Sequence, residues 1–160
     1  CDIKPENILF DYQGIPKLID FSLARDLRSS KNIPKTGSVL WVSPEQWSGH
    51  ILDIRSEIYS IGGLMHYIAT GLPPFFPDAS AENERDSVRE KHLNTQIPDA
   101  TAKNPLIPSV ISYCIAKCLA KIPERRFQSI SSLAYYLDNH KNIDTISEKW
   151  EYFNKPNLLT

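Results

Sequence analysis

Residues 1–10 read CDIKPENILF, and they place an acid, a lysine and an asparagine within six positions just ahead of an apolar run. A second acid, Asp20, follows Asn7 by thirteen residues. Phosphoryl transfer uses such a set, because an acid orients the attacking hydroxyl, a cation offsets the charge of the moving phosphoryl, and oxygen ligands hold the metal. The stretch therefore points to phosphoryl-transfer chemistry on a loop that leads into a strand.

The composition is that of an ordinary globular domain. The chain has 160 residues, of which 41% are hydrophobic and 23% charged, and its net charge is -1. A balanced charge offers no attraction to nucleic acid or to an anionic membrane, and no apolar run approaches the roughly 20 residues that span a bilayer. We therefore expect no nucleic-acid partner and no membrane insertion.

The three cysteines are Cys1, Cys114 and Cys118. Their odd number favours reduced thiols in a cytoplasmic protein. The pair at positions 114 and 118 fits either half of a metal site or two small apolar residues on the buried side of a helix. We favour the buried helix, because no histidine or further cysteine lies near the pair in sequence.

The hydrophobic pattern predicts a mostly α-helical fold with a small β-hairpin. Apolar runs at 8–10 and 17–19 flank a glycine-bearing turn, and the polar stretch 25–36 has no period and predicts a mobile loop. Apolar residues at three- and four-residue steps predict a buried central helix over 56–70, which Gly71 and Pro73 end. A charged, mostly exposed helix is expected over 83–93. Further helices are expected over 108–120 and from an N-cap at Ser129, and the pattern fades after Asn139.

The segments DIKPEN at 2–7 and DFS at 20–22 resemble the catalytic and metal-binding loops of eukaryotic-type Ser/Thr protein kinases. Four more segments match that family in the same order: TGSVLWVSPEQ at 36–46, DIRSEIYSIG at 53–62, LPPF at 72–75 and KIPERRFQS at 121–129. The resemblance implies a partial kinase C-terminal lobe over 1–138, a C-terminal extension or linker over 139–160, and an absent N-terminal lobe.

The resemblance also implies roles for single residues, with ATP and Mg²⁺ as cofactors and a protein as substrate. Asp2 would be the catalytic acid, Lys4 the lysine that neutralises the transferring phosphoryl, Asn7 and Asp20 the metal ligands, and Leu9 the apolar residue beneath the adenine ring. Each has a plainer interpretation: a surface charge, a solvated lysine, a loop cap, a turn acid and a core leucine, respectively.

The segment at 36–46 is expected to belong to the activation and substrate-binding part of the fold. Ser38 takes the place of the family threonine that bonds the catalytic acid and lysine, and Trp41 takes the place of a tyrosine. Glu45 matches a glutamate that pairs with a distant arginine, for which Arg126 is the candidate. A planar guanidinium can hold a carboxylate with two parallel hydrogen bonds.

Three residues depart from the family pattern. Cys1 stands where an arginine usually reads a phosphate, Ser22 replaces the glycine of the DFG motif, and Glu57 replaces an aspartate that ties down the catalytic loop. None of these changes removes a group that touches ATP or metal, so they argue for altered regulation. Two hypotheses stay open: a Ser/Thr kinase catalytic fragment, and a pseudokinase-type regulatory or binding module without catalysis.

A narrower resemblance links this chain to kinase-like modules fused to ATPase and sensor histidine-kinase modules in large signalling proteins. It rests on the DFS, SPEQ and DIRSEIYSIG segments and on Ile107-Pro108 with Ser112 nearby.

Because nothing in the sequence resembles the glycine-rich loop or strand lysine that hold ATP, we expect the fragment alone to be inactive and to bind Mg·ATP no better than millimolar.

Overall fold

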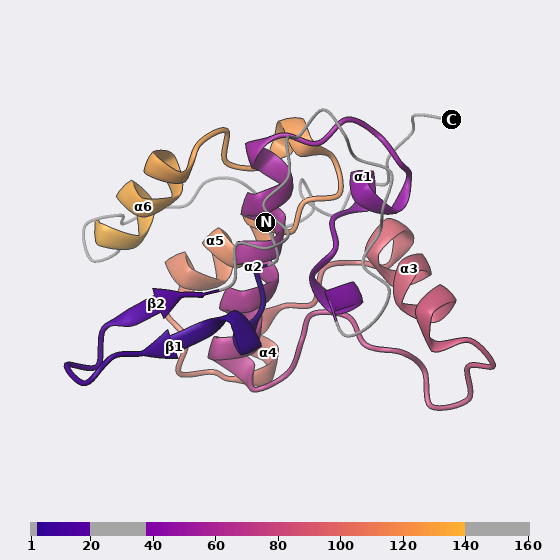
Figure 1. The fold of residues 1–160 in the computed structure, drawn as a ribbon, viewed down its shortest axis with the longest axis horizontal. Coiled ribbons are helices and arrows are strands. Elements are labelled where there is room, and N and C mark those ends of the chain that lie inside the picture. The colour runs from indigo at the N-terminus through magenta and orange to yellow at the C-terminus, as the bar shows by residue number, and fades with distance from the viewer. Residues whose placement is uncertain (1–2, 20–37, 140–160) are drawn as a thin grey trace.

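The computed structural model describes residues 3–19 and 38–139, with Ser38 described by its backbone alone. The predicted fold class is confirmed, because helices dominate beside one two-stranded sheet (Figure 1). The elements in chain order are η1 (Pro5–Asn7), β1 (Ile8–Phe10), β2 (Pro16–Leu18), η3 (Ser38–Trp41), α1 (Pro44–Trp47), α2 (Ile54–Thr70), α3 (Glu84–Asn94), α4 (Ala100–Lys103), α5 (Ser109–Cys118), η4 (Pro123–Arg125) and α6 (Ile130–Asp138).

The predicted hairpin is confirmed as an antiparallel pair in which Ile8 faces Leu18 and Phe10 faces Pro16. Its turn is closed by Asp11, whose Oδ1 accepts hydrogen bonds from the backbone of Gln13 and Ile15, both at 2.9 Å. Gly14 follows with a φ of 76°, a left-handed conformation that favours glycine. The hairpin projects from one side of the helical body (Figure 1).

Helix α2 runs through the middle of the molecule, with α1 and α3 on one side and α5, α6 and the hairpin on the other (Figure 1). Asp53 caps its first turn by accepting from the backbone N–H of Arg55 at 2.8 Å. Gly71 ends it as predicted, with a φ of 76° and a 2.8 Å bond from its N–H to the Tyr67 carbonyl.

The burial of α2 is less complete than its apolar pattern predicts. Ile58 and Tyr59 are fully buried, but Ile68 is 73% exposed within the part of the chain that the structure describes. The difference follows from packing, since α5, η3 and α4 contact α2 while no described element covers Ile68. The prediction of a helix buried all round is therefore wrong at its C-terminal end.

The main core lies between α2 and α5. Cys114 and Cys118 are free thiols with no exposed surface, which confirms their predicted place on the buried side of a helix. Burial raises the pKa of Cys114 to about 11 and raises that of Cys118 further, so both thiols are protonated and unreactive. A Cβ added at Gly62 would lie 2.5 Å from the Cβ of Cys118, so the two helices meet closely at this glycine.

A smaller core joins α3 to the segment that leads into α1. Val42, Trp47 and Val88 form its centre, and the guanidinium of Arg85 lies 5.2 Å over the Trp47 ring. The predicted charged helix over 83–93 is confirmed by α3, which Asn83 caps through bonds from the backbone of Arg85 and Asp86.

The last helix, α6, begins after Ser129, whose hydroxyl accepts from the backbone of Ser132 at 3.1 Å as an N-cap does. The predicted loop over 25–36 and most of the predicted extension over 139–160 lie outside the described residues. Among the helices that the structure describes, none combines the length and the apolar character needed to cross a membrane.

Candidate active site and its buried support

The structure places Asn7 at the base of the hairpin. Pro5 starts the short helix η1, which suits its fixed backbone angle, and Asn7 ends that helix at 6% exposure. The backbone N–H of Asn7 donates to the Lys4 carbonyl at 3.0 Å, and the Asn7 carbonyl accepts from the N–H of Ile19 at 2.8 Å. One backbone hydrogen bond thus links Asn7 to the residue that precedes Asp20, the other expected metal ligand.

The remaining expected catalytic and ATP-binding residues fall into two groups. Asp2 and Asp20 lie outside the described residues, and Lys4 is partly exposed beside η1. Leu9 is 55% exposed on β1 and takes no part in either described core. Its exposure disfavours the plain core interpretation and leaves the adenine-facing one as a proposal.

Trp41 is buried at the end of η3, the short segment expected to contact substrate. Its ring meets the Tyr67 ring edge-on at a centroid distance of 5.9 Å, and a Cβ added at Gly63 would lie 3.2 Å from it. The Trp41 carbonyl accepts from the Ser60 hydroxyl at 2.8 Å. These contacts fix the segment Ser38–Trp41 against α2, while nothing is described of the Ser38 side chain.

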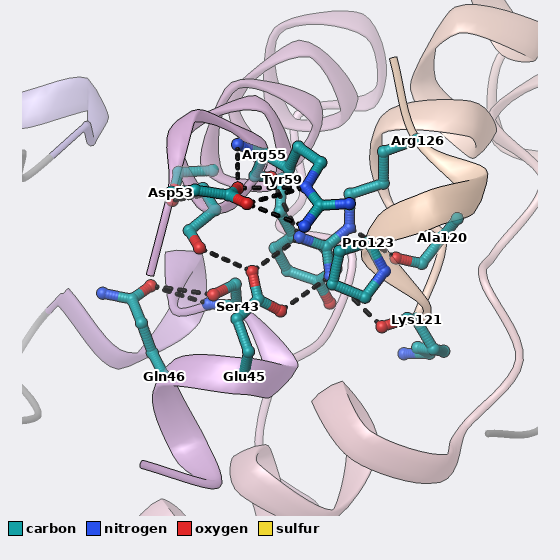
Figure 2. Close-up of polar contacts among 12 residues, drawn as sticks. Ser43, Glu45, Gln46, Asp53, Arg55, Tyr59, Ala120, Lys121, Pro123 and Arg126 are labelled. Atoms are coloured by element: carbon teal, nitrogen blue, oxygen red, sulfur yellow. Dashed lines mark hydrogen bonds and ion pairs between the residues drawn. The ribbon is translucent and has the colours of Figure 1, made fainter. Parts of the chain in front are cut away.

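Glu45 and Arg126, the expected ion pair, lie together in the interior (Figure 2). The guanidinium grips the carboxylate with two bonds, from Nη1 to Oε1 at 2.7 Å and from Nη2 to Oε2 at 2.8 Å. The Ser56 hydroxyl donates to the same Oε1 at 2.6 Å. The pair therefore joins α1, the first turn of α2 and the segment after α5, which are far apart in sequence.

Arg126 uses all five of its N–H donors. Nε donates to the Ala120 carbonyl at 2.7 Å, and beyond the carboxylate Nη1 reaches the Arg55 carbonyl at 2.9 Å and Nη2 the Lys121 carbonyl at 3.2 Å. Full pairing is what allows an arginine that is only 2% exposed to remain charged in the core.

Electrostatics agree with this geometry. Burial by itself would raise the pKa of Glu45, but the hydrogen bonds and charge of Arg126 and the Ser56 hydroxyl outweigh it, so the pKa lies below its usual value. Tyr59 lies beneath the guanidinium, with its ring centroid 4.9 Å from Arg126 Cζ. Burial raises the pKa of the Tyr59 hydroxyl, which stays neutral.

We call the interior group of Glu45, Arg126, Ser56, Tyr59 and His92 the buried support. Sequence reasoning did not assign three of these residues. Ser56 and Tyr59 lie inside the matched DIRSEIYSIG segment, so the motif itself carried a signal for both. His92 lies in a helix expected to be mostly exposed, and no spacing marks it. It has no exposed surface in the structure, and its Nδ1 lies 2.9 Å from the Tyr59 hydroxyl.

The matched motifs, the hairpin with Asn7 at its base and the buried Glu45–Arg126 pair together define a kinase-type C-terminal lobe. A comparison with protein-family models matches residues 1–136 to the protein kinase domain. The chain therefore belongs to the protein kinase family.

Three relatives with curated descriptions are serine/threonine kinases of bacteria. The chain is 34% identical over 152 residues to the serine/threonine-protein kinase PrkC of Bacillus subtilis, a match that covers 92% of this chain and 22% of the relative. It is 32% identical over 138 residues to the DNA damage-responsive serine/threonine-protein kinase RqkA of Deinococcus radiodurans, covering 84% of this chain and 20% of that one. It is also 32% identical over 136 residues to the serine/threonine-protein kinase PknB of Mycobacterium leprae, covering 82% and 21%. The chain thus spans about a fifth of the length of these relatives.

Proposed function

We propose that residues 1–160 form part of the catalytic domain of a protein serine/threonine kinase, which transfers phosphate from ATP to protein hydroxyl groups. The observation that carries the proposal is the geometry of the hairpin base. There the backbone hydrogen bond from the Ile19 N–H to the Asn7 carbonyl links the buried Asn7 to the residue before Asp20. Similarity to bacterial serine/threonine kinases over most of the chain supports the same activity.

The donor chemistry at the hairpin base fits a magnesium ion. Asn7 and Asp20 both offer hard oxygen atoms, which Mg²⁺ prefers, and Asn7 is held by its neighbours' backbone and is nearly buried. When bound, the ion would neutralise charge on the ATP phosphates. In this proposal Asp2 orients the substrate hydroxyl and accepts its proton, Lys4 offsets charge on the phosphoryl, and Leu9 lies beneath the adenine.

We place this activity in the cytoplasm, where ATP is supplied and thiols such as the free, buried Cys114 and Cys118 stay reduced. The division into a kinase region over 1–138 and an extension over 139–160 stays part of the proposal. Linkage to ATPase or histidine-kinase modules also stays a prediction, which rests on the narrower sequence resemblance alone.

The test uses the full natural polypeptide that contains residues 1–160, incubated with labelled ATP, Mg²⁺ and a generic protein substrate. We expect Asp2→Asn to lower the transfer rate by about a thousandfold or more, because it removes the proton acceptor in a unit whose members act together. Glu6→Gln is the matched control, since Glu6 is an exposed acid of the same loop. Equal rates for the Asp2 variant and the unsubstituted protein would reject the proposal and favour a pseudokinase.

A further inference from the structure

His92 is a fully buried histidine in the last turn of α3, a helix whose surface is otherwise largely polar. Its Nδ1 lies 2.9 Å from the Tyr59 hydroxyl of α2. The Phe75 ring meets the imidazole edge-on at a centroid distance of 5.1 Å. Burying an imidazole costs free energy unless its ring nitrogen atoms form hydrogen bonds, so the partners of both nitrogen atoms matter.

Helix α3 packs against the segment Ser38–Trp41, and the backbone of Leu40, in the middle of that segment, interacts with the imidazole. This backbone interaction raises the pKa of His92, but burial and the charge of Lys121 outweigh it. They lower the pKa to about 3, so the ring is neutral. A neutral imidazole has one donor and one acceptor. If Nδ1 accepts from the neutral Tyr59 hydroxyl, the proton is on Nε2, the nitrogen left for Leu40.

The contact with Leu40 falls short of a full hydrogen bond, because Nε2 has no partner of good geometry among the described residues. Hydrogen bonds at functional sites are often long without substrate and shorten when substrate binds. The neighbouring residue is already fixed, since the Trp41 carbonyl accepts from Ser60 of α2 at 2.8 Å. His92, bonded to Tyr59 of α2, is thus a further link between α2 and this segment, and the one that lacks a formed hydrogen bond to it.

Residues next to the buried support fix the position of His92. Lys121 Nζ donates to the His92 carbonyl at 2.8 Å and to the Lys91 carbonyl at 3.0 Å, and lies 4.0 Å over the Phe75 ring. Tyr59, the other partner of His92, lies beneath the Arg126 guanidinium. The position of the imidazole is therefore set by three separate parts of the chain.

We infer that His92 is a positioning residue that, with Tyr59, aligns the backbone of the segment Ser38–Trp41 for binding of the protein substrate. The inference rests on the proposed function, with ATP and metal held at the hairpin, and on the expectation from the sequence that this segment belongs to the substrate-binding part of the fold. The inference predicts separate effects on two kinetic parameters. A misaligned segment weakens binding of the protein substrate and raises its KM, whereas KM for ATP stays unchanged.

The kinetic test compares His92→Leu, His92→Gln and Tyr59→Phe in the full polypeptide that contains residues 1–160. We expect His92→Leu to raise KM for the protein substrate about tenfold, with kcat and KM for ATP changed by less than about twofold. His92→Gln should recover KM to within about threefold of the unsubstituted value, since its amide N–H can still reach toward Leu40.

The matched control is His66→Leu. His66 is also a buried histidine, 2% exposed, but its Nδ1 lies 2.9 Å from the Leu72 carbonyl at the other end of α2. We expect this variant to lose stability without a change in KM for either substrate. An equal rise of KM for the protein substrate in both leucine variants would show general loosening and overturn the inference, as would an unchanged KM in His92→Leu.

A second readout does not depend on catalysis. Hydrogen exchange followed by mass spectrometry should show faster exchange over 38–47 in His92→Leu and Tyr59→Phe but not in His66→Leu. If the unsubstituted polypeptide transfers no phosphate, the proposed function fails and this measurement alone decides the inference. Unchanged exchange over 38–47 in both variants would overturn it.

Discussion

The hairpin and the buried support around Glu45 differ in which side chains they bury: the hairpin exposes large apolar side chains, whereas the support buries charged ones. On the hairpin, Leu9 and Phe10 are 55% and 71% exposed, whereas Arg126 in the support is 2% exposed. Apolar residues are commonly exposed one by one, but a charge is buried only where it is paired and hydrogen-bonded. Burial of charge, more than burial of apolar surface, therefore marks the part of this molecule that organises the fold.

The difference implies separate consequences for substitution. Removing Glu45 or Arg126 from the support strands the other charge in the interior, which costs free energy of folding. Changing a side chain on the exposed hairpin removes little packing, so its effect should fall on chemistry. Each of the following variants asks whether this separation holds.

The largest effect on stability is expected for Arg126→Ala. It would leave Glu45 buried without its bidentate partner and the carbonyls of Ala120 and Lys121 without their donor. We expect the free energy of unfolding to fall by about 3–5 kcal/mol. Urea denaturation read by pulse-labelled hydrogen exchange in α2 and α5 measures it.

The control for that variant is Arg89→Ala, which changes an exposed arginine of α3. A change within about 0.5 kcal/mol is expected there. A similar loss in both variants would contradict the special role of the buried pair.

A smaller, pH-dependent effect is expected from His92. Its pKa is lowered from 6.5 to about 3 by burial, so below pH 6.5 the unfolded chain binds a proton that the folded chain does not. Stability contributed by the neutral ring is therefore complete above pH 6.5 and falls as the pH drops toward 3. Between pH 7 and pH 5 we expect a loss of about 2 kcal/mol from this residue.

The measurement is the same urea titration at several pH values, with His92→Gln as the comparison. The variant should show a shallower pH dependence, leaving the share of His66, whose pKa is also lowered by burial. Parallel curves for the variant and the unsubstituted protein would show that His92 is not buried in its neutral form.

The smallest effect on stability is expected on the hairpin. Leu9→Ala and Phe10→Ala should each change the free energy of unfolding by less than about 0.5 kcal/mol, because both side chains are exposed. If Leu9 lies beneath adenine, only its variant raises KM for ATP. Steady-state kinetics at varied ATP checks this, and equal effects of the two variants would count against the role of Leu9.

The elements with regular signals could be predicted from the sequence. The short apolar runs on either side of a glycine-bearing turn predicted the hairpin, and the caps Ser129 and Gly71 predicted helix boundaries close to those observed. The partners Glu45 and Arg126 could be proposed from two matched segments, although 81 residues separate them. The sequence could not show the exposure of Ile68 or the burial of His92, because both depend on which elements pack nearby in three dimensions.

The most direct test of the division between chemistry and support is phosphate transfer by Asp20→Ala in the full polypeptide, measured with hydrogen exchange in α2 on the same samples. Asp138→Ala, at the exposed end of α6, is the control. We predict that Asp20→Ala loses transfer by about a thousandfold or more while exchange in α2 stays unchanged. Transfer at the level of the unsubstituted protein would contradict the assignment of the metal ligand, and with it the chemistry proposed for the hairpin.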